Sequence, residues 1–215
     1  MANYKNYIII PYRDRAEHLK QFIPHYFKLL NNIEIFIIEQ DDKKLFNRGM
    51  LMNVGFDIAS KSTGNKYFTF HDVDMLYIGD KIEKIYSYPE KPTHTATACE
   101  QYDYKMPYSN YFGGVCLFNE KDFLKINGFS NSFNGWGAED DNLLFRIKKN
   151  KMDINRILNC KYKSLSHERN IDREALKINR ELQYTKYDDG LNTLKYEINS
   201  IEKITDIATK YKVKI

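Results

Sequence analysis

The segment Tyr7-Ile8-Ile9-Ile10-Pro11 is a short apolar run that a proline ends. Such a run is typical of a strand that is buried on both faces of a parallel sheet. Similar runs occur at residues 33–38 and 67–70, and the segments between them, 16–30 and 47–60, carry apolar residues at helical spacing. We therefore expect strand, helix, strand, helix, strand in an α/β fold with right-handed crossovers.

The pattern becomes less regular along the rest of the chain. Pro24 predicts a kink in the first helix, or two short helices. Strands are expected at residues 93–98, 114–118 and 162–165. A helix capped by Asn119 should end before Gly128, and another is expected at residues 139–149. The chain from residue 170 to 194 is polar, with no clear pattern.

Bulk composition limits the kind of protein this can be. The chain has 215 residues, enough for one domain, and a formal charge of +4 with no run of five like charges. Dispersed charge argues against a nucleic-acid-binding protein. The three cysteines have no metal-binding or disulfide spacing, and no apolar run reaches the length of a membrane span. We therefore expect a cytoplasmic protein with buried free thiols.

The stretch from Asn134 to Asp141 combines the only tryptophan, flanked by glycines, with three consecutive carboxylates. An aromatic ring beside carboxylates suits a sugar, because the ring covers an apolar face and the carboxylates accept bonds from hydroxyls. The alternative is a solvated helix start, where acids interact favourably with the helix dipole. A third possibility is a non-catalytic sugar-binding module, built from the same residues.

The pair Asp72 and Asp74 follows the third predicted strand. Side chains two residues apart in an extended chain lie on the same face, so both carboxylates can point in one direction. Ligands of open α/β sheets bind beyond the carboxyl ends of the strands, and hard divalent cations prefer oxygen ligands. The pair therefore fits a metal-bound nucleotide, although short acidic pairs also cap turns.

Three arginines could meet phosphates near the same edge. Arg13 and Arg15 follow the first strand, and Arg48 follows Phe46 and Asn47. Arginine makes planar, bidentate contacts to phosphate, and an aromatic ring can stack on a base. The alternatives are surface ion pairs for the arginines, and a helix N-cap at Asn47 with Phe46 as a hydrophobic staple.

Two further sites are open to two interpretations. Gly113 and Gly114 follow Tyr111 and Phe112 and would let backbone approach a ligand closely, or form a simple bulge. His167 follows a predicted strand and could be structural. It becomes a metal-ligand candidate if it faces Asp74.

Seven motifs in order give the chain a family resemblance over about residues 7 to 198. They are Ile10-Pro11-Tyr12-Arg13-Asp14-Arg15, Phe46-Asn47-Arg48 with Asn53-Val54-Gly55-Phe56, His71-Asp72-Val73-Asp74, Tyr111-Phe112-Gly113-Gly114-Val115, Asn127-Gly128-Phe129, Gly135-Trp136-Gly137-Ala138-Glu139-Asp140-Asp141, and Asp189-Gly190-Leu191-Asn192. Together they resemble the β-1,4-galactosyltransferase family. The resemblance implies a GT-A fold with a single Rossmann-like mixed sheet flanked by helices.

The resemblance also implies an inverting, manganese-dependent transfer of galactose from UDP-galactose to a hydroxyl of an acceptor sugar. The acceptor would be N-acetylglucosamine, glucose or xylose. The alternative enzyme is a GT-A transferase of another UDP-sugar, such as UDP-N-acetylgalactosamine. Residues 1–75 would form a nucleotide-binding half, residues 76–200 an acceptor-binding half and residues 201–215 a C-terminal extension.

Site roles follow from the resemblance, residue by residue. Asp140 would be the general base, with Glu139 beside it, and Asp74 and His167 would hold the metal. The donor would lie against Arg13, Arg15, Phe46, Arg48, Asp72, Tyr111, Gly114 and Trp136. The acceptor would lie against Asp141, Tyr108 and Trp136, the last of these on a loop that closes after the donor binds. The third metal ligand differs from the family, which has Met or a second His where this chain has Ser164 and Arg169.

Overall fold

The computed structural model describes residues 4–168 and 171–215, so Arg169 lies outside the described residues. The α-helices are α1 (Ala16–Leu29), α2 (Arg48–Ser60), α3 (Ile82–Ile85), α4 (Glu120–Lys125), α5 (Glu139–Lys149) and α6 (Arg173–Leu182). The strands are β1 (Lys5–Tyr12), β2 (Ile33–Gln40), β3 (Lys66–His71), β4 (Met75–Tyr77), β5 (Thr93–His94), β6 (Ala98–Cys99), β7 (Val115–Asn119), β8 (Asn155–Arg156), β9 (Lys161–Ser164), β10 (Glu197–Thr205) and β11 (Ala208–Lys214).

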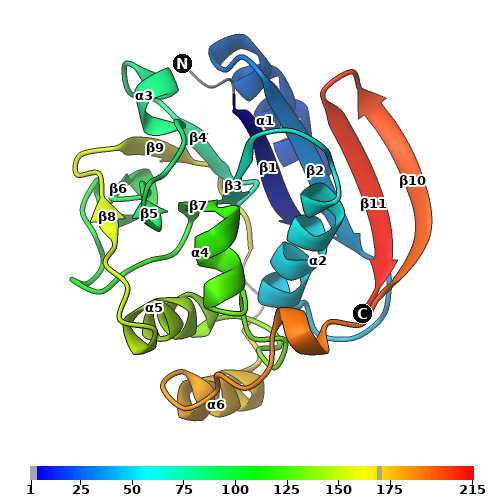
Figure 1. The fold of residues 1–215 in the computed structure, drawn as a ribbon, viewed down its shortest axis with the longest axis vertical. Helices are drawn as coiled ribbons and strands as arrows, with labels where there is room; N and C mark the ends of the chain where they lie inside the picture. Colours follow the sequence, from blue (N-terminus) through cyan, green and yellow to red (C-terminus); the bar gives the residue numbers. More distant parts are fainter. Residues whose placement is uncertain (1–3, 169–170) are drawn as a thin grey trace.

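Eight strands form one mixed sheet in the order β10-β11-β2-β1-β3-β7-β5-β8. Strands β11, β2, β1 and β3 run parallel, and β7 is antiparallel to β3 (Figure 1). A second sheet contains β4, β9 and β6. The predicted α/β class and mixed sheet are confirmed, but the second small sheet was not expected.

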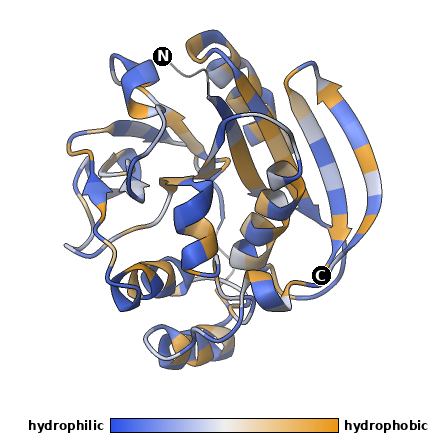
Figure 2. Ribbon diagram, in the orientation of Figure 1, coloured by the Kyte–Doolittle hydropathy of each residue, from blue (hydrophilic) through white to orange (hydrophobic). Residues whose placement is uncertain are grey.

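The apolar run in β1 is buried on both faces, as expected of a central parallel strand. Ile8 and Ile10 pack in one core cluster with α1, whereas Tyr7 and Ile9 pack in another with α2, α4 and α5. The period of two along the strand therefore sends alternate side chains to the two helical layers. Figure 2 shows that the central strands are mostly hydrophobic, whereas the β10–β11 hairpin mixes hydrophobic and hydrophilic residues.

Gly55 shows why α2 can lie so close to this sheet. A Cβ at that position would lie 2.3 Å from a methyl group of Ile9. Only a residue without a side chain lets the helix backbone approach the strand this closely. The motif residues around Gly55 are therefore structural.

Residues of two other motifs connect segments that are far apart in the sequence. Asn53 exchanges hydrogen bonds with the backbone of Phe129, donating at 2.8 Å and accepting at 2.9 Å. Asp189 forms an ion pair of 2.8 Å with Arg146, whose side chain is 1% exposed. A buried guanidinium needs such a partner, so Asp189 is a stabilising residue.

The predicted local elements mostly agree with the structure. Asn47 and Asn119 cap α2 and α4, accepting bonds from the N–H groups of Met50 and Asp122. The predicted helix at residues 16–30 is one helix that contains the exposed Pro24, so of the two predicted alternatives, a kink or two short helices, the second is wrong. The three cysteines are free and buried, as predicted.

Three elements differ from the sequence-based expectation. The strand expected at residues 93–98 is divided between the two sheets, as β5 and β6. The polar segment after residue 170 contains α6, which Asp172 caps by accepting a bond from Ala175 N–H. The C-terminal residues form β10 and β11, and β11 extends the main sheet beside β2 (Figure 1). No helix of the described chain is both long and apolar enough to span a membrane.

Candidate active site

A cleft of about 950 Å³ opens beyond the carboxyl ends of β1 and β3. Thirteen of the fourteen predicted site residues line it. They are Arg13, Arg15, Phe46, Arg48, Asp72, Asp74, Tyr108, Tyr111, Trp136, Glu139, Asp140, Asp141 and His167. These residues come from segments scattered over more than 150 positions, and the sheet topology brings them together. Their location agrees with the rule that ligands of open α/β sheets bind at this edge.

Gly114 is the exception. It does not line the cleft, and a Cβ there would lie 2.7 Å from Sδ of Met75 and 2.9 Å from Cβ of Ala96. With φ at +80°, it also occupies a conformation that favours glycine. The structure thus corrects the predicted donor contact: Gly114 serves close packing behind the cleft.

Asp74 and His167 form one corner of the cleft. Nε2 of His167 lies 3.0 Å from Oδ2 of Asp74, and this hydrogen bond is the main cause of the raised pKa of His167. Nδ1 of the same ring lies 3.3 Å from a guanidinium nitrogen of Arg15. The structure therefore meets the condition that made His167 a ligand candidate.

The donor set in this corner fits a divalent cation. Carboxylate oxygen and imidazole nitrogen both suit manganese, and neighbouring ligands of an octahedral ion are about 3 Å apart. In the described part of the chain, His, Cys, Asp and Glu side chains form no group of three that could hold a metal. Asp74 and His167 would therefore supply only part of a coordination sphere, and diphosphate oxygens and water suit the remainder.

Asp72 and Asp74 do not share a face through strand alternation. They lie in the turn between β3 and β4, and they have different partners. Asp72 accepts a hydrogen bond of 2.6 Å from Nε of Arg48. The turn thus directs one carboxylate to the metal corner and the other to the centre of the cleft.

Arg48 lies among three carboxylates at the centre of the cleft. Besides Asp72, it contacts Oδ1 of Asp140 at 2.7 Å and Oε1 of Glu139 at 3.5 Å through Nη1. The guanidinium connects the end of β3 to the first turn of α5. One guanidinium therefore interacts with three carboxyl groups.

This imbalance favours protonation of the carboxyls. Burial, followed by the charge of Asp140, raises the pKa of Glu139 to about 8, although Arg48 opposes the change. Burial also raises the pKa of Asp72 to about 6, again against Arg48. At neutral pH the cluster therefore retains a proton, held mainly at Glu139.

Gly113 makes room for this cluster, and the sequence reasoning did not single it out as a site residue. A Cβ there would lie 2.5 Å from Oδ2 of Asp140 and 2.9 Å from the hydroxyl of Tyr111. The two glycines of the motif thus make room for different neighbours: Gly113 for Asp140 and Tyr111, and Gly114 for Met75 and Ala96. The glycine pair itself was the signal, but its local sequence does not reveal which member lies against the carboxylates.

Asp141 and Tyr108 form the outer part of the acidic end. The Tyr108 hydroxyl donates a hydrogen bond of 2.9 Å to Oδ1 of Asp141. Burial raises the pKa of Asp141, and that of Tyr108 is raised too. Both are groups that accept or donate hydrogen bonds to sugar hydroxyls.

The tryptophan loop forms the rim beside these acids. Trp136 is 45% exposed, and its neighbours Gly135 and Gly137 have φ values of +75° and +100°. Asn179 of α6 donates hydrogen bonds to the carbonyl oxygens of Asn134 (3.0 Å) and Gly137 (3.1 Å). The loop is therefore attached to α6 on both sides of the indole.

Arg13 and Phe46 form the opposite end of the cleft. Arg13 donates to the carbonyl oxygens of Lys44 (2.8 Å) and Asp42 (3.2 Å), and its guanidinium lies 5.7 Å from the centre of the Phe46 ring. Lys43 and Lys44 also line this end. The sequence reasoning missed this lysine pair, for which the adjacent positive charges before Phe46 were the available signal.

Comparison with known proteins places the chain in a family. Residues 1–87 match the model of the N-terminal region of glycosyl transferase group 7, and residues 93–168 match that of an N-terminal domain of galactosyltransferase. Human β-1,4-galactosyltransferase 4 is 35% identical over 91% of this chain and 59% of its own length. Human β-1,4-galactosyltransferase 6 is 39% identical over 88% of this chain and 51% of its own length. The chain thus spans between half and three-fifths of these relatives.

Solved structures agree with the sequence relatives. The catalytic domain of Drosophila β-1,4-galactosyltransferase 7, in complex with xylobiose, superposes with a TM-score of 0.84 at 29% identity, covering 99% of this chain and 94% of that one. A mutant of the same enzyme, in complex with manganese, UDP-galactose and xylobiose, superposes with a TM-score of 0.82 at 28% identity. A mannosyltransferase from Pyrobaculum calidifontis gives 0.55 at 10% identity and shares the fold.

The expectation of a cytoplasmic protein is wrong. The relatives that the chain matches are Golgi galactosyltransferases, and they are longer than this chain. The expectation rested on the unpaired cysteines and on the lack of a membrane-length apolar run, and neither property fixes the compartment in which a protein resides. From its ordered motifs, its fold and its relatives, the chain belongs to the β-1,4-galactosyltransferase family.

Proposed function

We propose that this protein transfers galactose from UDP-galactose to a hydroxyl of an acceptor sugar, with inversion to a β-1,4 linkage. The observation that carries the proposal is one cleft with a metal-ligand pair at one corner and three carboxylates from the start of α5 at another. Human and Drosophila relatives named as β-1,4-galactosyltransferases support the reaction. The Drosophila complex with manganese and UDP-galactose supports the metal and the donor.

The donor would lie between Phe46 and the metal corner. Phe46 offers an aromatic face to the base, and Arg13 holds that ring and its loop in place. Asp74 and His167 would hold the manganese ion, which supplies positive charge to the departing diphosphate when bound. Arg15, which contacts His167, would add a guanidinium to the same anion.

Asp140 is the proposed general base. Its Oδ1 accepts the bond from Arg48, and among the described residues no donor hydrogen-bonds its Oδ2. Oδ2 would take the proton from the acceptor hydroxyl while that oxygen attacks the anomeric carbon opposite the UDP. One displacement inverts the configuration, and general-base help of this kind is typically worth about 10²- to 10⁴-fold in rate.

Glu139 would act through Arg48 rather than on substrate directly. A carboxyl group with a pKa of about 8 is mostly neutral at pH 7 and leaves Arg48 to Asp72 and Asp140. Asp141 and Tyr108 would bind hydroxyls of the acceptor at the outer end, and Trp136 would cover the sugars. These roles agree with the family resemblance and with the positions of the side chains.

The test is a transfer assay with purified protein, manganese, UDP-galactose and β-glycosides of N-acetylglucosamine, glucose and xylose. Wild type should form a β-1,4 disaccharide with at least one of them. Asp140→Asn should lower kcat at least about 100-fold while its affinity for UDP and manganese stays the same. Unimpaired turnover in Asp140→Asn would refute the assignment of the base. Transfer only from UDP-N-acetylgalactosamine would refute the assignment of the donor.

The loop that carries Trp136 gives a second test. If the loop closes over the donor, the indole leaves water when UDP and manganese bind, and its fluorescence changes. Because Trp136 is the only tryptophan, the signal needs no deconvolution. An unchanged emission spectrum at saturating UDP and manganese would argue against closure.

A further inference from the structure

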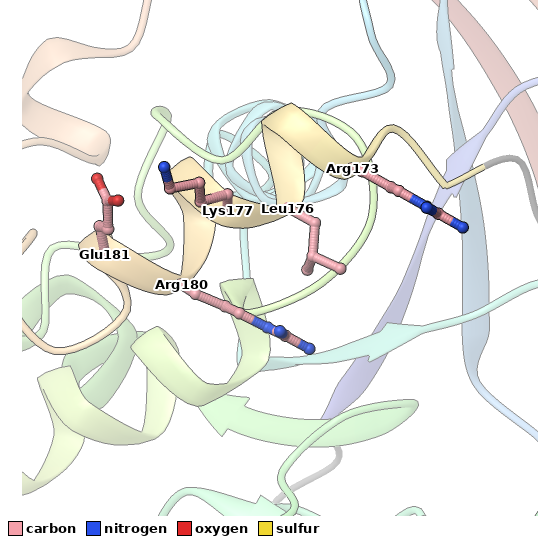
Figure 3. Close-up of a pocket in the computed structure, with 5 residues that line it drawn as sticks. All are labelled: Arg173, Leu176, Lys177, Arg180 and Glu181. Carbon is pink, nitrogen blue, oxygen red and sulfur yellow. The ribbon is translucent and has the colours of Figure 1, made fainter.

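Helix α6 presents two arginines and a leucine on one face. Figure 3 shows the side chains of Arg173, Leu176 and Arg180 pointing to one side of the helix, away from Lys177 and Glu181. Their spacing of three and four residues explains the shared face. These five side chains line a hollow of about 540 Å³.

The hollow adjoins the active-site cleft. Leu176 and Arg180 line both, and Asp172 and Gln183 at the two ends of α6 line the cleft as well. A molecule that extends out of the cleft over α6 would therefore contact Arg180 and pass close to Arg173.

Hydrogen bonds fix α6 to the acceptor end of the cleft. Asn142, which follows Asp141 in α5, donates to the carbonyl oxygens of Gln183 (3.1 Å) and Lys186 (2.7 Å). Asn179, which is 1% exposed, holds the loop of Trp136. The arginine face is thus attached to the residues proposed to bind the acceptor.

The two guanidinium groups are available for a ligand. Within residues 4–168 and 171–215, neither Arg173 nor Arg180 forms an ion pair or a side-chain hydrogen bond, and both are exposed. Glu181, the only acid that lines the hollow, forms no ion pair with Lys177 or Arg180 in the same described part.

We propose that Arg173 and Arg180 bind an anionic group of the acceptor, so that the preferred acceptor is a saccharide bearing a phosphate, sulfate or carboxylate beyond the reacting sugar. A guanidinium pairs with such oxyanions through two parallel hydrogen bonds. Leu176 offers an apolar contact for the sugar ring between them. The inference rests on the proposed function, because it assumes that the cleft holds an acceptor sugar.

The donor's diphosphate is the competing anion. It has its own cations at the other end of the cleft, where Arg13, Arg15, Lys43 and Lys44 line the wall. Arg173 lines only the outer hollow. The position of α6 beside the acceptor acids therefore favours an anion on the acceptor.

The experiment compares acceptors that differ only in charge. Neutral β-glycosides of the sugar that the wild type uses, and the same glycosides bearing a phosphate or a carboxylate on the aglycone side, are assayed with manganese and UDP-galactose. Wild type should give a higher kcat/KM for at least one charged acceptor, and added salt should reduce this preference. The phosphate and carboxylate arms then identify which oxyanion is recognised.

The double variant Arg173→Gln/Arg180→Gln should reduce the ratio of charged to neutral kcat/KM by about tenfold or more, because each charged hydrogen bond is worth about one decade. Lys28→Gln removes an exposed positive charge from α1 and should leave the ratio as in wild type. An equal ratio in the double variant and wild type overturns the inference. The inference is also overturned if the affinity of the double variant for UDP falls by the same factor as the ratio, because the arginines would then belong to the donor site. Failure of the wild type to use any acceptor would overturn the proposed function itself.

Discussion

Glu139→Gln should make the protein less sensitive to alkaline pH. The side chain of Glu139 is 12% exposed, and its pKa of about 8 lies far above the ordinary value of 4.5. The unfolded chain loses this proton near pH 4.5, whereas the folded protein keeps it until about pH 8. The folded state therefore binds more protons throughout this interval, and stability falls as the pH rises.

The magnitude follows from the size of the shift. Each pH unit in the interval changes the free energy of unfolding by about 1.4 kcal/mol per proton. Between about pH 6 and pH 8, allowing for partial titration near pH 8, Glu139 should cost the wild type about 2 kcal/mol. Asp72 acts in the same direction, but chiefly below its pKa of about 6.

The assay is urea denaturation of wild type and Glu139→Gln at pH 6 and at pH 8, without donor or metal. The difference in the free energy of unfolding between the two proteins should change by about 2 kcal/mol in favour of the variant as the pH rises. Glu83→Gln removes an exposed acid of α3 and serves as the control, whose pH dependence should match wild type. A constant difference between Glu139→Gln and wild type at both pH values would refute the protonated cluster.

Three further predictions test other parts of the structure. Gly113→Ala should lower kcat more than it weakens UDP binding in steady-state assays, because the added Cβ would lie 2.5 Å from Oδ2 of Asp140; a wild-type kcat would show that the carboxylate does not need this space. Asp74→Asn should weaken UDP binding only when manganese is present, measured by titration calorimetry; equal loss without manganese would contradict a metal role. Asp189→Ala should lower the free energy of unfolding by about 3–5 kcal/mol in urea, because it leaves the guanidinium of Arg146 buried without its carboxylate; a loss below about 1 kcal/mol would refute that reasoning.

Local sequence was enough to predict the central fold. The apolar runs that became β1, β2 and β3 are too short and too uniform for surface helices, and the segments between them have helical periodicity. Side chains just after such strands must lie at one edge of the sheet. This is why Arg13, Arg15, Asp72 and Asp74 line one cleft, whereas the other predicted site residues that line it were identified through the family resemblance.

Other elements, or their positions, could be established only from the tertiary structure. Register shifts near Ser200 and Thr205 interrupt the period of two in β10, so the hairpin does not show a strand pattern. Strand β11 is held beside β2 by long-range pairing, which no local pattern encodes. Helix α6 was missed although Asp172 caps it and Ala175, Ile178 and Leu182 have helical spacing. Only its position, which depends on Asn142 and Asn179, required the tertiary structure.

The sequence by itself determined which residues carry the chemistry, because strand ends, motif order and residue types are local properties. Only the tertiary structure decided how they interact. Arg48, predicted to bind the donor, lies between Asp72 and Asp140, which are 68 positions apart in the chain. The charge balance of a site depends on such distances through space and on burial, and neither is a property of any short segment.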